Sequence, residues 1–446
     1  MCGISVVING SRFEAKTMSE AIKRRGSSPP QLHELPDGTI VGFNHLPIVG
    51  MVNQPFMNTW LNGFISNYKE LAELHKIRLS NDSDTEFLAR FLARFGLTRL
   101  HELNGFFAVV WYDYEKQELH TFTDRYGIKQ LYKYKDGSTY YICSEVKGIL
   151  ALFPEIEIDR RAEKDWQYSL GVLTPDTVYK GIRRVPCLQV EPVQEREISY
   201  EHAKIIVEDL LEKSFKRNDT KLRKGVFLSG GVDSGMLAKN MKPEYCFSMD
   251  YTDPEFSEIE TIKTNSTAKH LTIIHNDSTF DKYAPLTLEA LDDYKVGACY
   301  TNFALTELAA KMGVQVLYSG AGADEIFDGY THRYNRSIIQ IVKRGKSDGE
   351  HAHGLTHKEY DWLYLRGILV VEDRMAGWHT IETRYPFLDN DLVDFVMSLP
   401  KEYKENKRIL RDVCGLHPNN AHGKKRGFSN PGGNQKWIDY VVEKMI

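Results

Sequence analysis

Short apolar runs broken by turn residues dominate the first half of the chain and predict β-strands. The clearest runs cover residues 3–8, 39–43, 106–112 and 119–122. Asp136-Gly137 separates two further runs, 131–134 and 140–143, which is typical of a hairpin. One helix is expected among these strands, over residues 84–95, because its apolar side chains recur at helical spacing. The pattern predicts a sandwich of sheets with flanking helices over residues 1–195.

From about residue 200 the apolar pattern changes to an alternation of helices and strands. A helix over 201–215 is followed by strand 225–228, helix 234–239, strand 245–249, helix 257–270, strand 271–275, helix 301–312 and strand 314–318. Such alternation predicts a parallel sheet with crossover helices. The remaining residues are predicted to be mostly helical. We therefore expect a second domain over residues 200–446, after a polar linker near 192–200.

The composition is that of an ordinary globular protein, with 42% hydrophobic and 26% charged residues. Basic residues number 57 and acidic residues 61, so the formal charge of −4 gives no electrostatic case for nucleic-acid binding. The apolar runs are far shorter than the roughly 20 residues that span a bilayer. The first residues also lack the apolar core of a signal peptide. We expect a soluble cytoplasmic protein without membrane or nucleic-acid partners.

The six cysteines form no C-x-x-C pair, which argues against a structural zinc site. Cys2 stands apart because it follows the initiator Met1. If Met1 is removed, Cys2 carries both a thiol and a free α-amine, and that amine can take the thiol proton. An incidental cysteine after the start codon is the plain alternative.

The segment around residue 230 predicts a phosphate-binding loop. It reads Val226-Phe227-Leu228-Ser229-Gly230-Gly231-Val232-Asp233-Ser234. An apolar strand leads through two glycines into a helix start, where backbone N–H groups and the helix dipole favour a di- or triphosphate. Asp233 is placed to hold Mg²⁺ against the phosphates. The loop lacks the GK[ST] ending of a Walker A motif. A plain strand–turn–helix corner has the same outline.

A second segment, 317–330, also runs from a strand into a glycine-rich turn with carboxylates. Ligands of parallel sheets bind at the carboxyl ends of strands, so Asp233 and Asp324 are expected to face one Mg²⁺–ATP. An ordinary acidic loop is the alternative for this segment alone. In the first half, Asn62 and Gly63 are expected to follow a strand and to offer two donors to an oxyanion. Asp84 opens the predicted helix 84–95 and is a candidate for holding a substrate ammonium.

The literal string SGGVDS resembles the PP-loop of ATP pyrophosphatases, and the layout of Cys2, Asn62, Gly63 and Asp84 resembles class II glutamine amidotransferases. Together the two halves resemble glutamine-hydrolysing asparagine synthetase over nearly the whole chain. Further landmarks in matching order are Arg25-Gly26, Gln54-Pro55, Asn104–Ala108, Asp124–Lys129, Ser144–Lys147, Ser319–Tyr330, Glu382–Asp389, Lys407–Arg411, and Lys425 with Phe428.

This resemblance implies an Ntn-type αββα sandwich followed by a doubly wound parallel-sheet PP-loop domain with a helical C-terminal part. It implies glutamine hydrolysis at Cys2, passage of ammonia through a tunnel, and adenylation of the aspartate side chain by Mg²⁺–ATP. The oligomeric state stays open, a homodimer included. Catalytic roles would fall to Cys2, Asn62, Gly63 and Lys425, and glutamine binding to His45, Asn62, Gly63 and Asp84. ATP would contact Leu228, Ser229, Gly230, Gly231, Asp233, Ser234, Met249, Ser319 and Gly320, with Asp233 and Asp324 as metal ligands.

The chain also departs from the family pattern. Ala321 stands where the family has a glutamate that helps to form or use the adenylate. His45 stands where an arginine binds the glutamine carboxylate, and a protonated His45 is expected to compensate in part. Phe64 replaces the Glu of the NGE motif, Ser27-Ser28 replaces the PD of RGPD, and Thr123 replaces an Arg. Two alternatives follow: the same chemistry on another carboxylate, or a degenerate member that keeps only glutaminase or binding function.

Overall fold

The computed structural model describes residues 1–48, 52–160, 177–189, 193–251, 257, 262, 268–292, 299–330, 356–416 and 433–445. The chain divides into two units, each described separately below. The first contains residues 1–164, 174–190 and 376–382, and the second contains 165–173, 191–375 and 383–446. One short stretch of the second half of the sequence, 376–382, therefore groups with the first unit.

The first unit contains two sheets whose strand pairs are antiparallel. One has the order β2-β3-β1-β8-β7-β9 and the other β4-β5-β6. The strands are β1 (Gly3–Ile8), β2 (Gln31–Glu34), β3 (Ile40–Asn44), β4 (Thr59–Ile65), β5 (Gly105–Asp113), β6 (Glu118–Thr123), β7 (Tyr132–Asp136), β8 (Thr139–Cys143) and β9 (Arg183–Arg184). The predicted hairpin is present, since β7 pairs with β8 around Gly137, whose φ is +53°.

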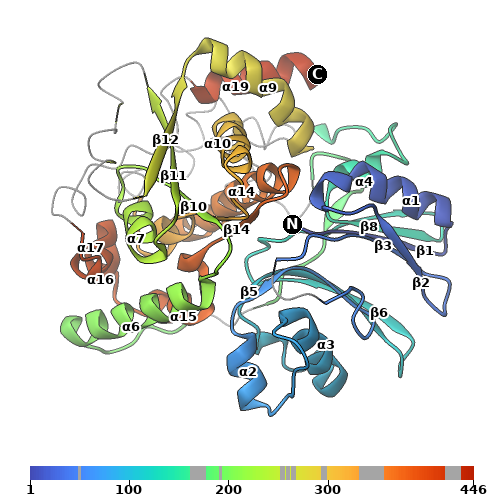
Figure 1. The fold of residues 1–446 in the computed structure, drawn as a ribbon, viewed down its shortest axis with the longest axis horizontal. Helices are drawn as coiled ribbons and strands as arrows, with labels where there is room; N and C mark the ends of the chain where they lie inside the picture. Colours follow the sequence, from blue (N-terminus) through green and yellow to red (C-terminus); the bar gives the residue numbers. More distant parts are fainter. Residues whose placement is uncertain are drawn as a thin grey trace. The chain divides into compact units, whose positions relative to one another are not determined.

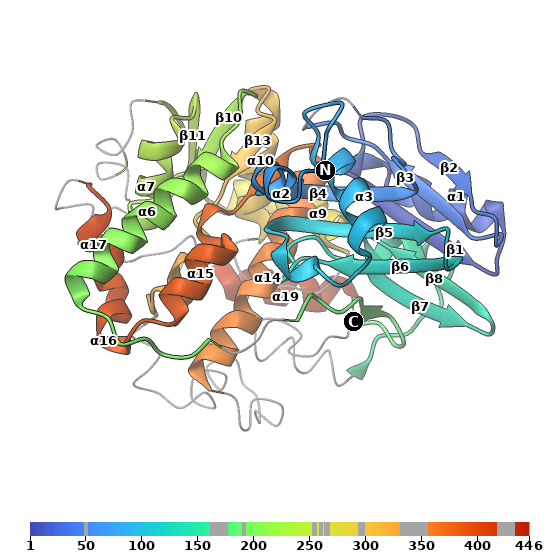
Figure 2. The same cartoon turned by 90° about the horizontal axis from the view of Figure 1, so that it is seen from below.

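Helices cover the outer faces of these two sheets (Figures 1 and 2). They are α1 (Arg12–Ala21), α2 (Tyr68–Leu74), α3 (Asp84–Phe95) and α4 (Val146–Leu150). One apolar core lies between the sheets and includes Ile4, Val41, Trp60 and Val110. A second joins α1 and α4 to the larger sheet through residues such as Met18. The first unit is therefore layered helix, sheet, sheet, helix.

Helix α3 shows how the sequence sets these boundaries. Ser83 caps its first turn by accepting a hydrogen bond from Glu86 N–H, and Gly96 ends it at a φ of +57°. The expected apolar face, including Phe87 and Phe91, is buried. The predicted range 84–95 is confirmed.

The second unit is built on a sheet of order β12-β11-β10-β13-β14, in which β12, β11, β10 and β13 pair in parallel. These strands are β10 (Lys224–Phe227), β11 (Tyr245–Tyr251), β12 (Lys269–His275), β13 (Val316–Tyr318) and β14 (Glu382–Arg384). The mixed α/β class with a parallel sheet is confirmed. The predicted boundary at 270/271 is wrong, because β12 already begins at Lys269.

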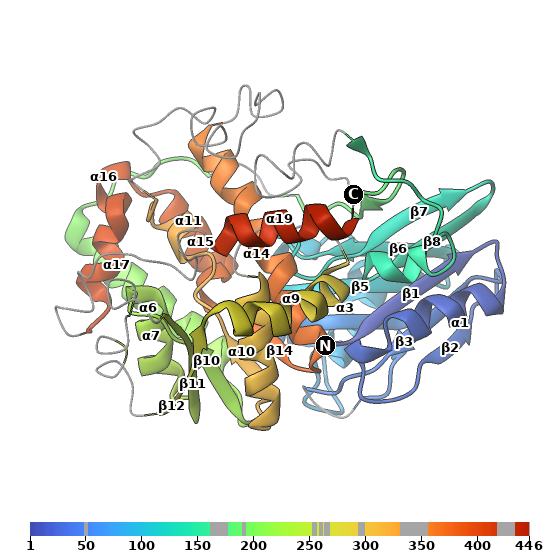
Figure 3. The same cartoon turned by 90° about the horizontal axis from the view of Figure 1, so that it is seen from above.

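Helices α7 and α10 lie on opposite sides of this sheet (Figures 1 and 3). The helices of this part of the chain are α6 (Tyr200–Asn218), α7 (Val232–Met241), α9 (Asp277–Leu291), α10 (Cys299–Lys311), α11 (Ala323–Ile326), α14 (His357–Trp378), α15 (Asn390–Met397), α16 (Lys401–Lys404), α17 (Arg408–Val413) and α19 (Gly433–Met445). In the described ranges, no helix has the length and apolar character needed to span a bilayer.

Candidate active sites

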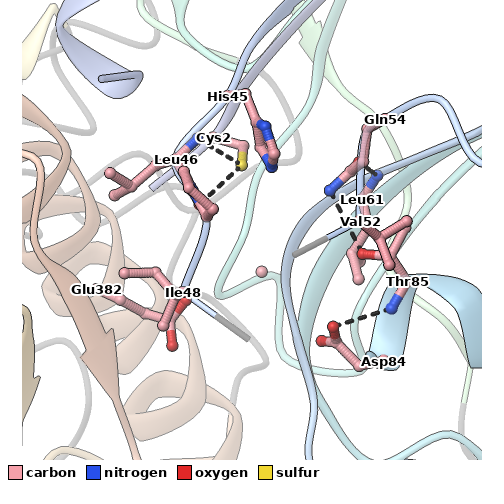
Figure 4. A pocket seen from close by; sticks show the side chains of 12 residues that line it. Cys2, His45, Leu46, Ile48, Val52, Gln54, Leu61, Asp84, Thr85 and Glu382 are labelled. Atoms are coloured by element: carbon pink, nitrogen blue, oxygen red, sulfur yellow. Dashed lines mark hydrogen bonds between the residues drawn. The ribbon is translucent and has the colours of Figure 1, made fainter. Parts of the chain in front are cut away.

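A pocket in the first unit gathers several of the predicted glutamine-site residues. Cys2, His45, Gly63 and Asp84 all line it. Figure 4 shows Cys2 and His45 on one side and Gln54, Asp84 and Thr85 on the other. Asn62 is not among the lining residues, although its neighbours Leu61 and Gly63 are. Four of the five residues predicted for glutamine hydrolysis therefore meet here, among twelve that line the pocket.

The Cys2 thiol is buried next to the chain terminus. Its Sγ accepts a hydrogen bond from Leu46 N–H at 3.3 Å, and Arg25 Nε donates to the Cys2 carbonyl at 2.8 Å. Burial raises the pKa of the thiol, whereas the N-terminal charge lowers it. Burial also lowers the pKa of the N-terminal amine, here that of Met1, to about 5. The Met1 amine is therefore mainly neutral at pH 7.

His45 differs from the expectation of a protonated side chain. Burial, together with the N-terminal charge, lowers its pKa below the usual value. The imidazole is therefore mainly neutral at pH 7 and does not supply the positive charge of the arginine that it replaces. Burial therefore opposes the protonated form of His45 on which the expected compensation depends.

Asn62 and Gly63 lie inside strand β4, so the prediction that they follow a strand is wrong. In this strand Gly63 pairs with Phe107 at a φ of +130°, and a Cβ on it would lie 2.0 Å from the Phe106 carbonyl oxygen. Both polar atoms of the Asn62 amide are buried without a hydrogen-bond partner among the described residues. Such an unsatisfied buried amide is unusual.

We expect Gly63→Ala to lower the free energy of unfolding by at least ~3 kcal/mol, because the new methyl group forces the paired strand β5 to move. Gly38→Ala is the matched control, since Gly38 also has a positive φ, +81°, but no atom within 4 Å of an added Cβ. That control should lose only about 1–2 kcal/mol. Urea unfolding of both variants measures the difference, and equal losses would contradict the close approach at Gly63.

Asp84 is held at the start of α3 by two backbone donors. Ile65 N–H donates to Oδ2 at 3.1 Å and Thr85 N–H donates to Oδ1 at 2.9 Å. Glu382 adds a second carboxylate to the pocket, and its charge opposes ionisation of the Cys2 thiol. The sequence did not predict a role for Glu382, because no spacing rule links this residue to Cys2, which is far from it along the chain.

The SGGVDS segment forms the predicted turn between β10 and α7. Ser234 Oγ lies 3.0 Å from both the backbone nitrogen and the Oγ of Ser229, while Gly231 N–H donates to Ser229 Oγ at 3.2 Å. Leu228 N–H donates to the Phe247 carbonyl, which ties the loop to β11, the strand that carries Met249. Ser229, Gly230, Gly231 and Ser234 are thus placed at one strand end.

The second predicted loop lies directly beside the first. Strands β10 and β13 are neighbours, and a Cβ on Gly320 would lie 3.1 Å from Asp233 Cβ and 3.5 Å from Ser234 N. A side chain at position 320 would therefore require Asp233 to move by a few tenths of an ångström. Ser319, at the end of β13, is buried and its N–H donates to the Arg384 carbonyl at 3.1 Å. The two loops therefore share the carboxyl edge of the sheet, as predicted.

Asp233 and Asp324 converge on one positive charge. Lys407 Nζ lies 2.5 Å from Asp233 Oδ2 and 2.7 Å from Asp324 Oδ1. Lys407 is buried, which lowers its pKa, while Asp233 opposes that shift. Lys407 lies in the segment Lys407–Arg411, which resembles the family. The sequence did not predict that its side chain bridges Asp233 and Asp324. Lys425, the lysine that the sequence did predict for this site, lies outside the described residues.

Two carboxylates that already share one cation fit a Mg²⁺ ion, which takes one or two protein carboxylates together with phosphate oxygens. Asp233 Oδ1 is also buried without a hydrogen-bond partner among the described residues. Among the described residues, no cluster of three or more His, Cys, Asp and Glu side chains forms a metal site from protein ligands alone. The site thus suits a metal that arrives with a phosphate ligand.

We expect Lys407→Met to lower the free energy of unfolding by about 3–5 kcal/mol, because buried Asp324 and partly buried Asp233 lose their counter-charge. Added Mg²⁺ should recover part of this loss in the variant. Lys401→Met is the control, since Lys401 is exposed. Chemical unfolding with and without Mg²⁺ measures both effects. A variant as stable as the wild type in metal-free buffer would show that the bridge contributes little.

Comparison with known families defines the class of protein. A profile described as glutamine amidotransferase domain matches residues 1–203, and one described as asparagine synthase matches 206–359 and 340–444. The chain thus joins an amidotransferase half to an ATP-utilising synthase half. It belongs to the family of glutamine-hydrolysing asparagine synthetases, as the sequence motifs predicted.

Named relatives share about a quarter of their residues with this chain. A Methanocaldococcus jannaschii relative with an asparagine synthetase designation is 27% identical, over all of this chain and 89% of its own. Asparagine synthetase [glutamine-hydrolyzing] 1 of Bacillus subtilis is 28% identical, over 93% of this chain and 83% of its own. A solved glutamine phosphoribosylpyrophosphate amidotransferase from B. subtilis covers 72% of this chain and 82% of its own, with 11% identity and a TM-score of 0.29.

Proposed function

We propose that this chain is a glutamine-dependent amidoligase that converts aspartate to asparagine with ATP. The glutaminase half is assigned to residues 1–195, with an Ntn-type fold, and the synthetase half to 200–446, with a PP-loop fold. The supporting observation is that one chain holds both a pocket around a near-terminal cysteine and a pair of strand-end loops with converging carboxylates. All proposed substrates are small cytoplasmic molecules.

In the first half, the Cys2 thiolate attacks the amide carbon of glutamine, and a free α-amine takes the thiol proton. The Gly63 N–H and the unsatisfied Asn62 amide stabilise the oxyanion, and Asp84 holds the substrate ammonium. His45 contributes a neutral hydrogen-bonding group next to the nucleophile. The C–N bond then breaks as the α-amine returns its proton to the leaving nitrogen, and the ammonia passes to the second half. Water hydrolyses the thioester and releases glutamate.

In the second half, the Ser229-Gly230-Gly231 turn and the N-terminus of α7 hold phosphate. Asp233 and Asp324 would hold Mg²⁺, which neutralises phosphate charge. Ser234 shapes the loop, and Leu228, Met249, Ser319 and Gly320 are assigned to the nucleotide. Lys425 is assigned to the reacting phosphate. The acceptor carboxylate attacks the α-phosphate and releases pyrophosphate, after which ammonia displaces AMP.

A panel of acids tests the acceptor. With ATP, Mg²⁺ and ammonia, aspartate should give the fastest release of pyrophosphate and AMP. Ala321 favours one competing function, the same chemistry on another carboxylate, and release with a different acid alone would establish it. Glutamate formation from glutamine without pyrophosphate release from any acid would instead indicate a bare glutaminase.

A further inference from the structure

Glu372 is a buried carboxylate at the proposed nucleotide site that the reaction above does not use. It lies on α14, and its Oε1 accepts a hydrogen bond from Ser319 Oγ at 3.0 Å. The same Ser319 Oγ accepts a hydrogen bond from Ala321 N–H at 3.2 Å. Glu372 is therefore linked through one hydroxyl to the loop position at which the family carries a glutamate and this chain carries Ala321.

Burying a carboxylate costs free energy of desolvation, and orienting the Ser319 hydroxyl does not require a charged group. A glutamine could accept the same hydrogen bond without the desolvation of a charge. Burial raises the pKa of Glu372 to about 7, even though Ser319 and Tyr385 both stabilise its charged form. The carboxyl group can thus take up and release a proton near neutral pH. Tyr385 lies beside both Glu372 and Asp373, and burial raises its pKa well above the usual value.

The charge of Glu372 indicates the step in which it acts. Negative charge opposes the attack of a carboxylate on an anionic triphosphate, so Glu372 has no electrostatic use in adenylation. Positive charge develops later, on the nitrogen of ammonia as it bonds to the acyl carbon. A group that removes a proton from that nitrogen accelerates this second step.

We propose that Ser319 and Glu372 form a proton relay that replaces the carboxylate missing at Ala321. This inference rests on the proposed function. As the C–N bond forms, Ser319 Oγ takes a proton from the nitrogen and passes its own proton to Glu372 Oε1. The acyl C–O bond breaks, and AMP leaves with the bonding electron pair. The products are the amide, AMP and a protonated Glu372, which then returns its proton to solvent.

The relay is tested by separating adenylation from amide formation in the intact chain. In Glu372→Gln, acid-dependent exchange of pyrophosphate into ATP should stay close to the wild-type rate. Amide formation from ammonia should fall about 100-fold, the lower range for loss of acid–base catalysis. The melting midpoint should not fall, because the buried charge is removed while the Ser319 hydrogen bond is kept. Glu402→Gln, at an exposed position, is the control.

Returning the carboxylate to the loop gives the decisive variant. Ala321 is only partly buried. The double variant Ala321→Glu/Glu372→Gln should regain most of the lost amide formation. Unchanged amide formation in Glu372→Gln, or a loss that the double variant does not repair, would overturn the relay and leave the proposed function intact. Absence of acid-dependent exchange in the wild type would overturn both.

Discussion

Replacing Cys2 by Ala should abolish the use of glutamine and leave ammonia-dependent synthesis intact. The variant loses the sulfur that forms the thioester, and removal of a catalytic nucleophile commonly lowers the rate by about 10⁴-fold or more. The second half does not need this thiol, because free ammonia enters after the glutaminase step. Glutamate release and pyrophosphate release, measured separately, follow the two halves.

Two controls accompany this experiment. Cys187→Ala removes a half-buried thiol that does not line the Cys2 pocket and should change neither activity. The intact mass of the purified chain shows whether Met1 has been removed, as the proposed base requires. If Cys2→Ala loses ammonia-dependent activity as well, the two-site description is wrong.

The reciprocal result is expected for Asp233→Asn. This variant keeps the shape of the side chain but loses half of the carboxylate pair that faces Lys407. Acid-dependent exchange of pyrophosphate into ATP should fall about 10³-fold, as expected when a preorganised electrostatic contact to the reacting group is lost. Glutaminase activity should stay at the wild-type level, because the Cys2 pocket belongs to the first unit.

Asp209→Asn is the matched control, since Asp209 is exposed on α6 and distant in sequence from both loops. Asp324→Asn should reproduce the loss seen for Asp233→Asn, because both carboxylates meet the same cation. Wild-type exchange in either variant would mean that the two carboxylates do not hold a metal together.

The sequence predicted the elements whose local signals agree. Helix α3 has a serine cap, a full apolar face and a terminal glycine, so its range could be read directly. The turn between β10 and α7 was equally clear. The sequence misled where a turn-like residue lies in a strand: Asn62 and Gly63 suggest a loop, but β4 uses the positive φ of Gly63 to pass close to Phe106.

Groups contributed by distant segments could not be predicted. Glu382, Lys407 and Glu372 reach their sites through tertiary packing, and no periodicity connects them with Cys2, Asp324 or Ser319. The protonation of His45 was also unpredictable, because it depends on burial and on the neighbouring N-terminal charge. The sequence motifs thus located both candidate sites, whereas the protonation states of the side chains in them depend on tertiary packing.

Transfer of isotope from amide-¹⁵N glutamine tests the central claim most directly. With aspartate, ATP and Mg²⁺, we expect asparagine labelled at the side-chain nitrogen, with glutamate and AMP formed alongside it. Release of labelled ammonia and glutamate without any labelled amide product, whatever acid is supplied, would contradict the account.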